Sequence, residues 1–398
     1  APPADPRAFS DSPPRACRKM AKLRDMMPPK PPGMPKGVIQ TFDSVKAIYI
    51  FSLVVTHNEL ISCREHSVRV SRRLPYETVD HGVEAMMGLF LISGWLSSAT
   101  WKDLAWAQHM RKKVARLLPP YVVGVLLTLV PFALEYERWS QALQLVLEFL
   151  TLGGWNPSLQ WNSFNRALWF VSTLLGYHYV SPLFLRRIRL LETRTLFLCI
   201  LALYVLRTGL AAATLFVLQA MYGDDLIQYV RIIHLWAPTQ IWLPFMGAML
   251  EQLSHRVELP ETVTPLKIGI LTDLLLVTVV SLSTFIPTTG NVIVDALIAY
   301  TNLITGPFIL VLVALLSADR NMIQVVTTAT PEVTKLFGSM LSLSYVLYLT
   351  HWPIVLTFAR FGDLANDSYS SVVSLTAIAL VCAIFLDAVV AGPFTRGF

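Results

Sequence analysis

The feature that most constrains this chain is a series of apolar segments, each about as long as a membrane is thick, which recurs from Val45 to Val390. An α-helix needs a stretch of about 20 apolar residues to cross the hydrocarbon of a bilayer. Charged residues make up only 15% of the chain, whereas an ordinary soluble domain has about 25%. The sequence therefore predicts one polytopic integral membrane domain and argues against a soluble globular protein.

We expect about ten transmembrane helices in this domain. They cover roughly residues 45–62, 83–101, 119–135, 166–186, 195–219, 230–250, 265–286, 291–316, 338–358 and 371–391. Each run is continuous rather than alternating, and a backbone in lipid must satisfy its hydrogen bonds within the segment, so the predicted fold class is all-α. A shorter apolar stretch, residues 139–152, carries Glu148 and is expected to form an interfacial or re-entrant helix.

The placement of positive charge supports this topology. With the amino terminus inside, 22 of the 32 Lys and Arg residues fall on inner segments and 8 on outer ones, while Lys46 and Arg207 lie within spans. Lys and Arg collect on the cytoplasmic side of membrane proteins. We therefore expect both termini on the cytoplasmic-equivalent side. The net charge of +6 reflects topology rather than a nucleic-acid partner, since the basic residues form no single stripe.

The chain divides into a proline-rich basic arm, residues 1–44, and the membrane domain, residues 45–398. The arm holds ten of the 25 prolines and eight basic residues, without the apolar periodicity of a helix. It also lacks the apolar segment of a secretory signal, so it is not expected to be an intact one; a processed organellar precursor and a truncated chain would both have this character. We expect an integral membrane protein; the pattern does not name the membrane, and an organellar one is among the candidates.

Metal and disulfide chemistry are not indicated. The four cysteines lie far apart without a CxxC spacing, and no phosphate-binding glycine loop or HExxH motif occurs. We expect no metal site and no resident cofactor. Six histidines show no metal-ligand spacing and receive no predicted role; they are His66, His81, His109, His178, His234 and His255.

The first predicted span carries a cation and a histidine, Lys46 and His57, separated by ten residues. Eleven residues of α-helix return to within about 20° of the starting direction and rise about 16 Å, so both side chains share one face. One interpretation is a snorkelling lysine plus a histidine bonded to a neighbouring helix. The other is a cation for the anionic end of a ligand and a general base near its reactive end.

This stretch resembles the first helix of the membrane-bound acyltransferase-3 family, whose pattern is a basic residue, ten intervening residues and a histidine. Further segments are similar to family motifs in the same order: 90–95 (FLISGW), 113–121 (KVARLLPPY), 168–172 (LWFVS) with Tyr179 and Pro182, 344–353 (SYVLYLTHWP) and 392–394 (GPF). The resemblance covers about residues 42–398. It implies the ten-helix architecture that hydropathy also predicts, and an acyl-transfer activity.

The sequence also departs from the family pattern. Lys46 stands where arginine is commoner, Met87 where an acidic residue often precedes the Ser-Gly pair, and Leu174 where many members have glutamate. The closing motif lacks its usual acidic residue. These changes keep the pair of Lys46 and His57, but they put the surrounding charge network in question.

The resemblance and the chemistry together assign roles to the donor-binding residues. An acyl-CoA is anionic at one end and reactive at the other, and its pantetheine arm is comparable in length to the offset of about 16 Å between Lys46 and His57. We expect Lys46, Lys113 and Arg116 to bind the donor, the last two as paired cations at i and i+3. The alternative for the inner basic segment is positive-inside charge alone.

His57 is the expected catalytic base, because a histidine can take a proton from a hydroxyl near neutral pH. It could also carry the acyl group itself, and the sequence leaves direct transfer and an acyl-histidine intermediate open. His351 is expected to assist catalysis; the alternative is that Tyr348, His351 and Trp352 form an interfacial aromatic belt. Supporting roles are expected for Tyr348 and, by resemblance alone, for Tyr121 and Trp169.

Three functions follow as hypotheses. The first is an O-acyltransferase that moves an acyl group, expected to be acetyl, from acyl-CoA to a hydroxyl of a sugar, lipid or small metabolite. The second is a catalytically silent relative that serves as a structural subunit of a larger membrane complex, to which the departures point. The third is a proton-coupled transporter, for which Asp273 or Asp295 would matter more than His57.

Overall fold

The computed structural model describes residues 41–51, 53–55, 79–101, 105–135, 139–156, 165, 167–223, 233, 236–257, 264–285, 292–316, 325–326, 329–361 and 369–391. These residues are helices and their connections, with no strand among them. The prediction of an all-α protein is confirmed for this part of the chain. Residues 1–40 of the arm and His57 lie outside it, whereas residues 41–44, placed in the arm by the sequence pattern, are helical.

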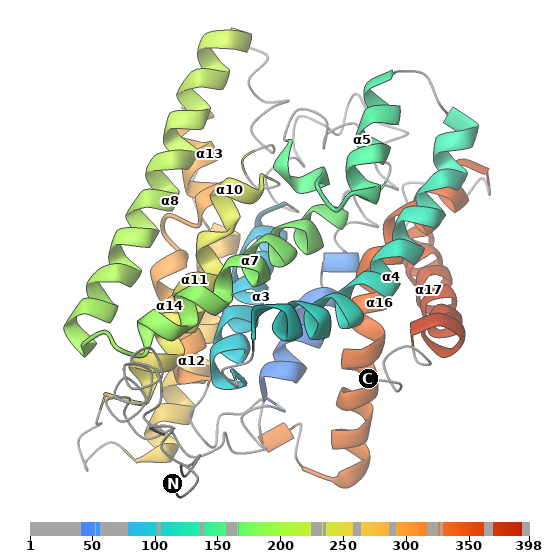
Figure 1. Ribbon diagram of the computed structural model, residues 1–398. Coiled ribbons are helices and arrows are strands. Elements are labelled where there is room, and N and C mark those ends of the chain that lie inside the picture. Colours follow the sequence, from blue (N-terminus) through green and yellow to red (C-terminus); the bar gives the residue numbers. More distant parts are fainter. Residues whose placement is uncertain are drawn as a thin grey trace, which may run out of the picture.

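The described helices follow one another along the chain, and Figure 1 shows their arrangement. They are α3 (Val79–Ala99), α4 (Trp106–Glu135), α5 (Trp139–Phe149), α7 (Leu168–Ile188), α8 (Thr193–Tyr222), α10 (Ala237–Gln240), α11 (Trp242–Ser254), α12 (Pro265–Phe285), α13 (Val292–Thr301), α14 (Gly306–Leu315), α16 (Pro331–Phe361) and α17 (Tyr369–Leu386). Short 3₁₀ and π segments, Gly153–Trp155 and Asp387–Ala391, complete them.

Four of the described helices are long and apolar enough to cross a membrane. They comprise Trp106–Ala133, Leu168–Ile188, Thr193–Met221 and Pro331–Phe358. Shorter apolar helices cover Ala85–Ala99, Gly306–Leu315 and Val373–Val389. The expectation of an integral membrane protein is thus supported, whereas the number ten and the sidedness of the termini remain predictions.

Two predicted spans differ from the observed helices. The expected span 291–316 is interrupted, because α13 ends at Thr301 and α14 begins at Gly306, with Asn302 in the left-handed region at φ 54°. The expected span 119–135 is the second half of a longer helix, since α4 begins at Trp106. The paired-basic segment is consequently part of a helix and not of a loop.

The core of the bundle is built around α3, which packs against α11 along its length (Figure 1). Small residues allow this approach: a Cβ added to Gly94 would lie 1.8 Å from the carbonyl oxygen of Pro244, and one added to Gly247 would lie 1.9 Å from that of Leu91. Small residues are the usual means by which membrane helices pack closely. The Ser-Gly segment therefore serves helix packing at Gly94.

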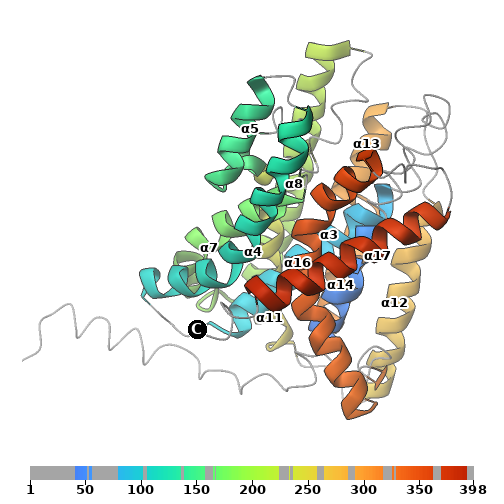
Figure 2. The same cartoon turned by 90° about the vertical axis from the view of Figure 1, so that its right-hand side faces the viewer.

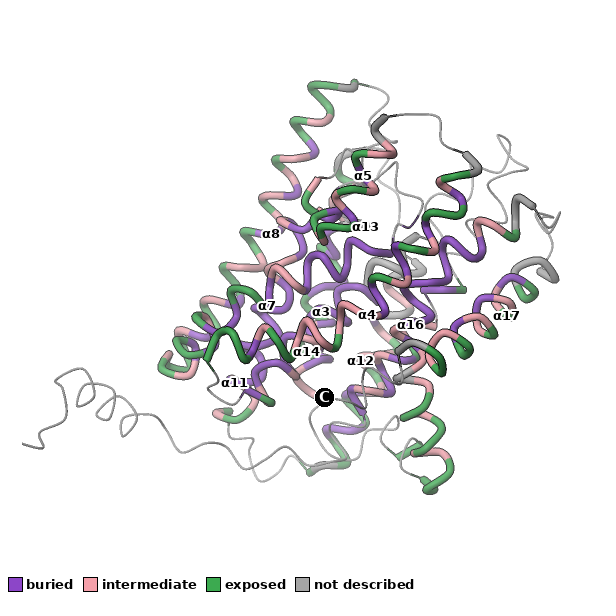
Figure 3. The backbone as a smooth tube through the Cα atoms, turned by 45° about the vertical axis from the view of Figure 1, so that its right-hand side comes forward, coloured by how far each residue is buried: buried purple, intermediate pink, exposed green. Residues whose placement is uncertain are grey.

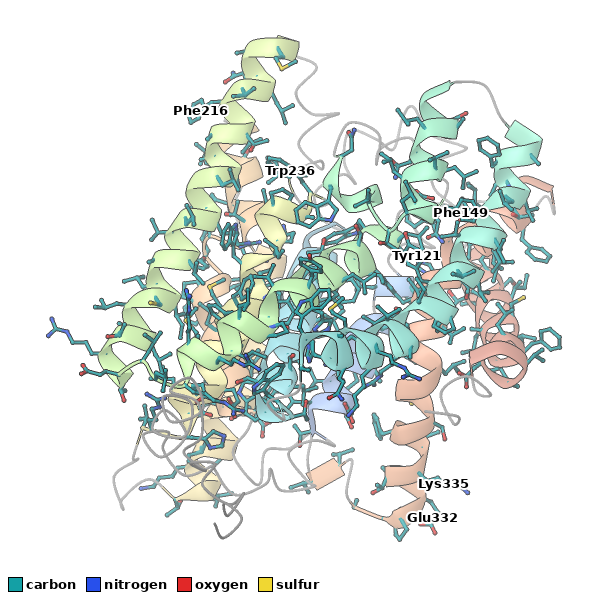
Figure 4. All side chains as sticks on the ribbon, in the orientation of Figure 1. Tyr121, Phe149, Phe216, Trp236, Glu332 and Lys335 are labelled. Carbon is teal, nitrogen blue, oxygen red and sulfur yellow. The ribbon has the colours of Figure 1, made fainter. Side chains whose placement is uncertain are left out.

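Burial follows the position of each helix in the bundle. Figure 3 shows the buried residues gathered on the central helices α3, α7 and α11, whereas α8 carries exposed residues along its outer side. Those exposed residues are large and apolar, among them Phe197, Leu201, Val205 and Phe216, and Figure 4 shows Phe216 projecting outward. A helix with an apolar outer surface is what a lipid environment requires.

The helical residues 41–51 and 53–55 run between α3 and the carboxy-terminal pair of α16 and α17. Phe42, Val45 and Leu53 belong to the main core. Val54 belongs to a second cluster with Leu347 of α16 and residues of α17, which lies across α16 (Figure 2). The first helix thus stands beside the helix that carries His351.

Prolines within the helices leave backbone carbonyls without their helical N–H donors, and side-chain donors replace the missing hydrogen bonds. A proline has no N–H, so the carbonyl four residues earlier loses its helical donor. Pro182 of α7 leaves the carbonyl of His178 without its helical N–H donor. The hydroxyl of Ser181 donates to that oxygen instead, at 3.1 Å. In lipid such compensation is needed, because no water replaces the missing donor.

Candidate active site

Lys46 forms an ion pair with Asp43, which lies about one turn earlier in the same helix. Its Nζ lies 2.7 Å from Oδ1 of Asp43, and 15% of its side chain is exposed. The sequence analysis assigned no role to Asp43. A carboxylate at i−3 neutralises part of the lysine charge and fixes the position of the ammonium along the helix.

The three predicted donor-binding residues lie within electrostatic range of one another. The charge of Lys113 interacts with those of Arg116 and Lys46, and that of Lys46 interacts with Arg116. Lys113 is half-buried and Arg116 is exposed. The structure therefore brings together cations from two helices that are about 70 residues apart in the sequence. Asp43 is the only acidic side chain among the described residues that pairs directly with this cluster.

His351 lies deep inside the bundle, with none of its surface exposed. Its Nδ1 is 2.7 Å from the carbonyl oxygen of Tyr348 and 3.2 Å from that of Leu347. Because a carbonyl only accepts, Nδ1 carries the proton, and Nε2 is the nitrogen that can accept one from another group. This tautomer is the one that a general base or an orienting acceptor requires.

The aromatic belt that was the alternative for this segment is not observed. Tyr348, His351 and Trp352 are all buried, whereas belt residues face the membrane surface. The ring of Tyr348 packs edge-on against Phe170 at 5.6 Å, and its hydroxyl points to Sδ of Met86 at 3.9 Å. These contacts give Tyr348 a packing role.

Trp169 and Tyr121 also take part in packing and hydrogen bonding. Trp169 contacts the ring of Phe90 with centroids 5.6 Å apart, which places it in the aromatic cluster with Phe170. The hydroxyl of Tyr121 donates to the backbone carbonyl of Glu148 at 2.5 Å and connects α4 to α5. Figure 4 labels Tyr121 on α4 and Phe149 on α5. The supporting roles predicted by resemblance stay predictions.

Tyr345 is a residue that the sequence analysis did not single out, although it lies within the 344–353 motif. Its hydroxyl donates to the carbonyl of Leu117 at 3.0 Å, and the ring interacts electrostatically with Arg116. Tyr345 therefore joins α16 to the cationic part of α4. Its position, three residues before Tyr348, could have indicated a shared helix face.

Two histidines without a predicted role also lie next to the cations. The rings of His109 in α4 and His178 in α7 are 5.8 Å apart, and both interact electrostatically with Lys113. The absence of metal-ligand spacing in the sequence left these two histidines without a predicted role. Their proximity depends on the packing of α4 against α7, which no local spacing reveals.

Arg207 is a cation buried within the span of α8, with 1% of its surface exposed. Its guanidinium donates to the carbonyl of Thr301, to Oε1 of Gln240 at 3.3 Å and to Oδ1 of Asn302 at 3.5 Å. It therefore caps the end of α13, where the chain leaves helical geometry. Asp273, Asp295 and Asp387 are only half-buried. Within the described residues, no group of three His, Cys, Asp or Glu side chains could hold a metal ion.

Comparison with known families gives one match. The family described as "Acyltransferase domain" (Acyl_transf_3) matches residues 39–388. Searches of curated proteins and of solved structures found no significant match. The chain belongs to the acyltransferase-3 family, as the motifs in the sequence predict, and the family together with the apolar helices identifies it as an integral membrane protein.

Proposed function

We propose that this protein is an O-acyltransferase that transfers an acyl group, acetyl being the expected one, from acyl-CoA to a hydroxyl of a sugar, lipid or small metabolite. The observation that supports this most is the cationic cluster of Lys46, Lys113 and Arg116 beside the helix of His351. Membership of the acyltransferase family supports the reaction class.

The charges of the cluster favour an anionic donor. Like charges repel one another, more strongly where burial reduces solvation as it does at Lys46, and Asp43 offsets only one of the three. A ligand that brings several negative charges would relieve this repulsion, and Arg and Lys are the usual ligands of phosphate. The diphosphate of CoA meets that requirement.

The reaction needs one proton acceptor and no metal. In the proposed step the acceptor oxygen forms a bond to the acyl carbon, the carbon–sulfur bond breaks, and His57 takes the hydroxyl proton that the leaving thiolate later receives. If His57 instead carries the acyl group, the same bonds break and form in two steps. His351 would orient the acceptor or stabilise charge through Nε2.

One observation favours the second candidate, a catalytically silent structural subunit. Met87 and Leu174 stand where the family resemblance leads us to expect acidic residues, and both are buried in the core. Because Met87 and Leu174 are apolar, these two positions contribute no negative charge to the candidate active site. A silent subunit would leave the membrane in fixed stoichiometry with partner proteins, and purification distinguishes it from an enzyme.

To test this, the purified protein is reconstituted in lipid and incubated with radiolabelled acetyl-CoA. A membrane extract provides the acceptors. The proposal expects label in an alkali-labile ester, lost in His57→Ala and strongly reduced in Lys46→Glu, while Lys46→Arg retains activity. The matched control is Arg111→Gln, an exposed cation on α4. No labelled ester from the wild-type protein, or equal labelling by His57→Ala, would contradict the proposal.

A further inference from the structure

The basic residues of α4 continue beyond the cluster described above. His109, Lys113 and Arg116 are four and three residues apart, so they share one face of the helix over a rise of about 10 Å. Arg116 lies at the end that interacts with Lys46 and Tyr345. His109 lies at the other end. We call His109, Lys113, Arg116, Lys46 and His178 the basic strip.

Helix α7 completes the far end of the strip. Oγ of Ser181 is 3.3 Å from Nε2 of His109, which fixes the orientation of that ring against α7. The ring of His178 lies beside it, and the charges of both Lys113 and Arg116 interact with His178. On α4, Lys113 lies about one helical turn and His109 about two turns from Arg116, and the ring of His178 lies beside that of His109.

One polar atom at this end has no partner. Nδ1 of His178 is buried and makes no hydrogen bond to any described residue, although 95% of the side chain is enclosed. A buried polar atom without a hydrogen bond costs free energy, so such atoms are found where a ligand or water completes the site. No acidic side chain of the described chain pairs with His178, His109 or Lys113.

We propose that the basic strip recognises two separate phosphate groups of one nucleotide, the diphosphate of CoA at Lys46 and Arg116 and its ribose 3′-phosphate at His109, Lys113 and His178. The inference rests on the proposed function and extends it to the discrimination between donors. Nδ1 of His178 donates to an oxygen of the second phosphate.

The orientation follows from the reactive end of the ligand. Tyr345 of α16 donates to the carbonyl of Leu117, the residue after Arg116, so this end of the strip is the one joined to the helix of His351. The diphosphate is connected to the thioester through the pantetheine arm, whereas the 3′-phosphate lies farther from it. The imidazole end, more distant from α16, is therefore the place for the 3′-phosphate.

The experiment compares the binding of CoA and of 3′-dephospho-CoA to the purified full chain in lipid nanodiscs. The wild-type protein should bind CoA about tenfold more tightly, the effect of one charge-assisted hydrogen bond. In His178→Ala the ratio should fall to within about twofold while the affinity for 3′-dephospho-CoA stays unchanged. His178→Asn places an amide near the position of Nδ1 and should restore much of the preference.

Arg111→Gln is the matched control, because Arg111 lies on the opposite face of α4 from His109 and Lys113 and is exposed. It should leave both affinities unchanged. Equal wild-type binding of the two ligands, or an equal loss of both in His178→Ala, overturns the inference. In that case, continued acyl transfer from both donors would still support the proposed acyltransferase function. If the protein binds neither ligand and transfers no acyl group, both the proposed function and the recognition of the 3′-phosphate are overturned.

Discussion

The side-chain amide of Asn165 donates to the backbone carbonyl of Leu349 at 2.8 Å, and this is the carbonyl that Pro353 leaves without its helical donor. The same amide lies 3.3 Å from the carbonyl of Gly124 in α4. A single buried side chain thus connects α4 to α16 two residues before His351. It stabilises the break in hydrogen bonding that the proline introduces into the helix of the candidate catalytic histidine.

Replacing Asn165 should destabilise this connection. Asn165→Ala leaves the Leu349 carbonyl buried without a donor, which costs about 1 to 3 kcal/mol of unfolding free energy. In a Pro353→Ala background the backbone regains an N–H, so the same substitution should cost less. Thermal unfolding of the four proteins in detergent measures the difference. An equal loss in both backgrounds would show that Asn165 does not act through Leu349.

The close packing of α3 and α11 predicts a second effect. Gly94→Ala or Gly247→Ala would place a methyl group within 2 Å of a backbone carbonyl, and backbone cannot move aside as a side chain can. We expect poor folding or a marked fall in the melting temperature. Gly209 of α8 is the control, since a Cβ there meets nothing within 4 Å. A Gly94→Ala protein as stable as Gly209→Ala would refute the close approach.

Arg207 gives a third prediction. Arg207→Lys keeps the charge, but one ammonium cannot reach Thr301, Gln240 and Asn302 in the manner of the guanidinium fork. The loss of charge-assisted hydrogen bonds, each about 1.5 to 3 kcal/mol, should lower the stability of the protein. Arg194 precedes the apolar part of α8 and is exposed, so Arg194→Lys should be neutral. Equal melting temperatures for the two variants would show that Arg207 does not stabilise the protein by capping α13.

His255 makes the stability of the carboxy-terminal end of α11 depend on pH. The hydrogen bond from its Nε2 to Glu251 at 3.0 Å raises the pKa of His255 above its ordinary value, with burial opposing and the carboxylate charge adding to the rise. The folded state therefore binds the proton more tightly. This contribution to stability is complete below the ordinary pKa of about 6.5 and is lost as pH rises through the higher folded pKa.

The melting temperature of the wild-type protein should accordingly fall as pH rises above about 6.5. His255→Gln removes the titrating group and should flatten that part of the profile. Ser98 also donates to Glu251, at 2.7 Å, so the carboxylate keeps a partner in the variant. A wild-type profile with the same slope as the His255→Gln profile would show that the pair does not contribute.

The fold class could be predicted from the sequence because hydropathy acts locally, residue by residue along each helix. The run of apolar residues at 291–316 predicts one span for the same reason, yet the chain breaks at Asn302. At the break Arg207 from another helix donates to the carbonyl of Thr301, and a pattern within the span does not contain that contact. Similarly, Pro353 marks a weakened helix in the sequence, but the amide that compensates for it belongs to Asn165, 184 residues before the Leu349 carbonyl that it binds.

The candidate site was predicted in part. Lys46, Lys113 and Arg116 could be named because cations near apolar segments are conspicuous and because their spacing resembles that of the family. His109 and His178 could not, since their relation to these cations arises from the packing of α4 with α7. The spacing of Tyr345 from Tyr348 indicates a shared helix face, but its contact with α4 arises from the packing of α16 against α4. For Asp43, the i to i+3 spacing before Lys46 was a signal in the sequence that would have predicted the ion pair.

The central claim is that the first helix and α4 together hold one anionic donor, and a density map of the protein with bound CoA tests it most directly. We predict phosphate density between Lys46 and Arg116, with the pantetheine arm extending along α16 toward His351. Density for CoA elsewhere, or a lipid between Lys46 and Arg116 at saturating CoA, would contradict the account.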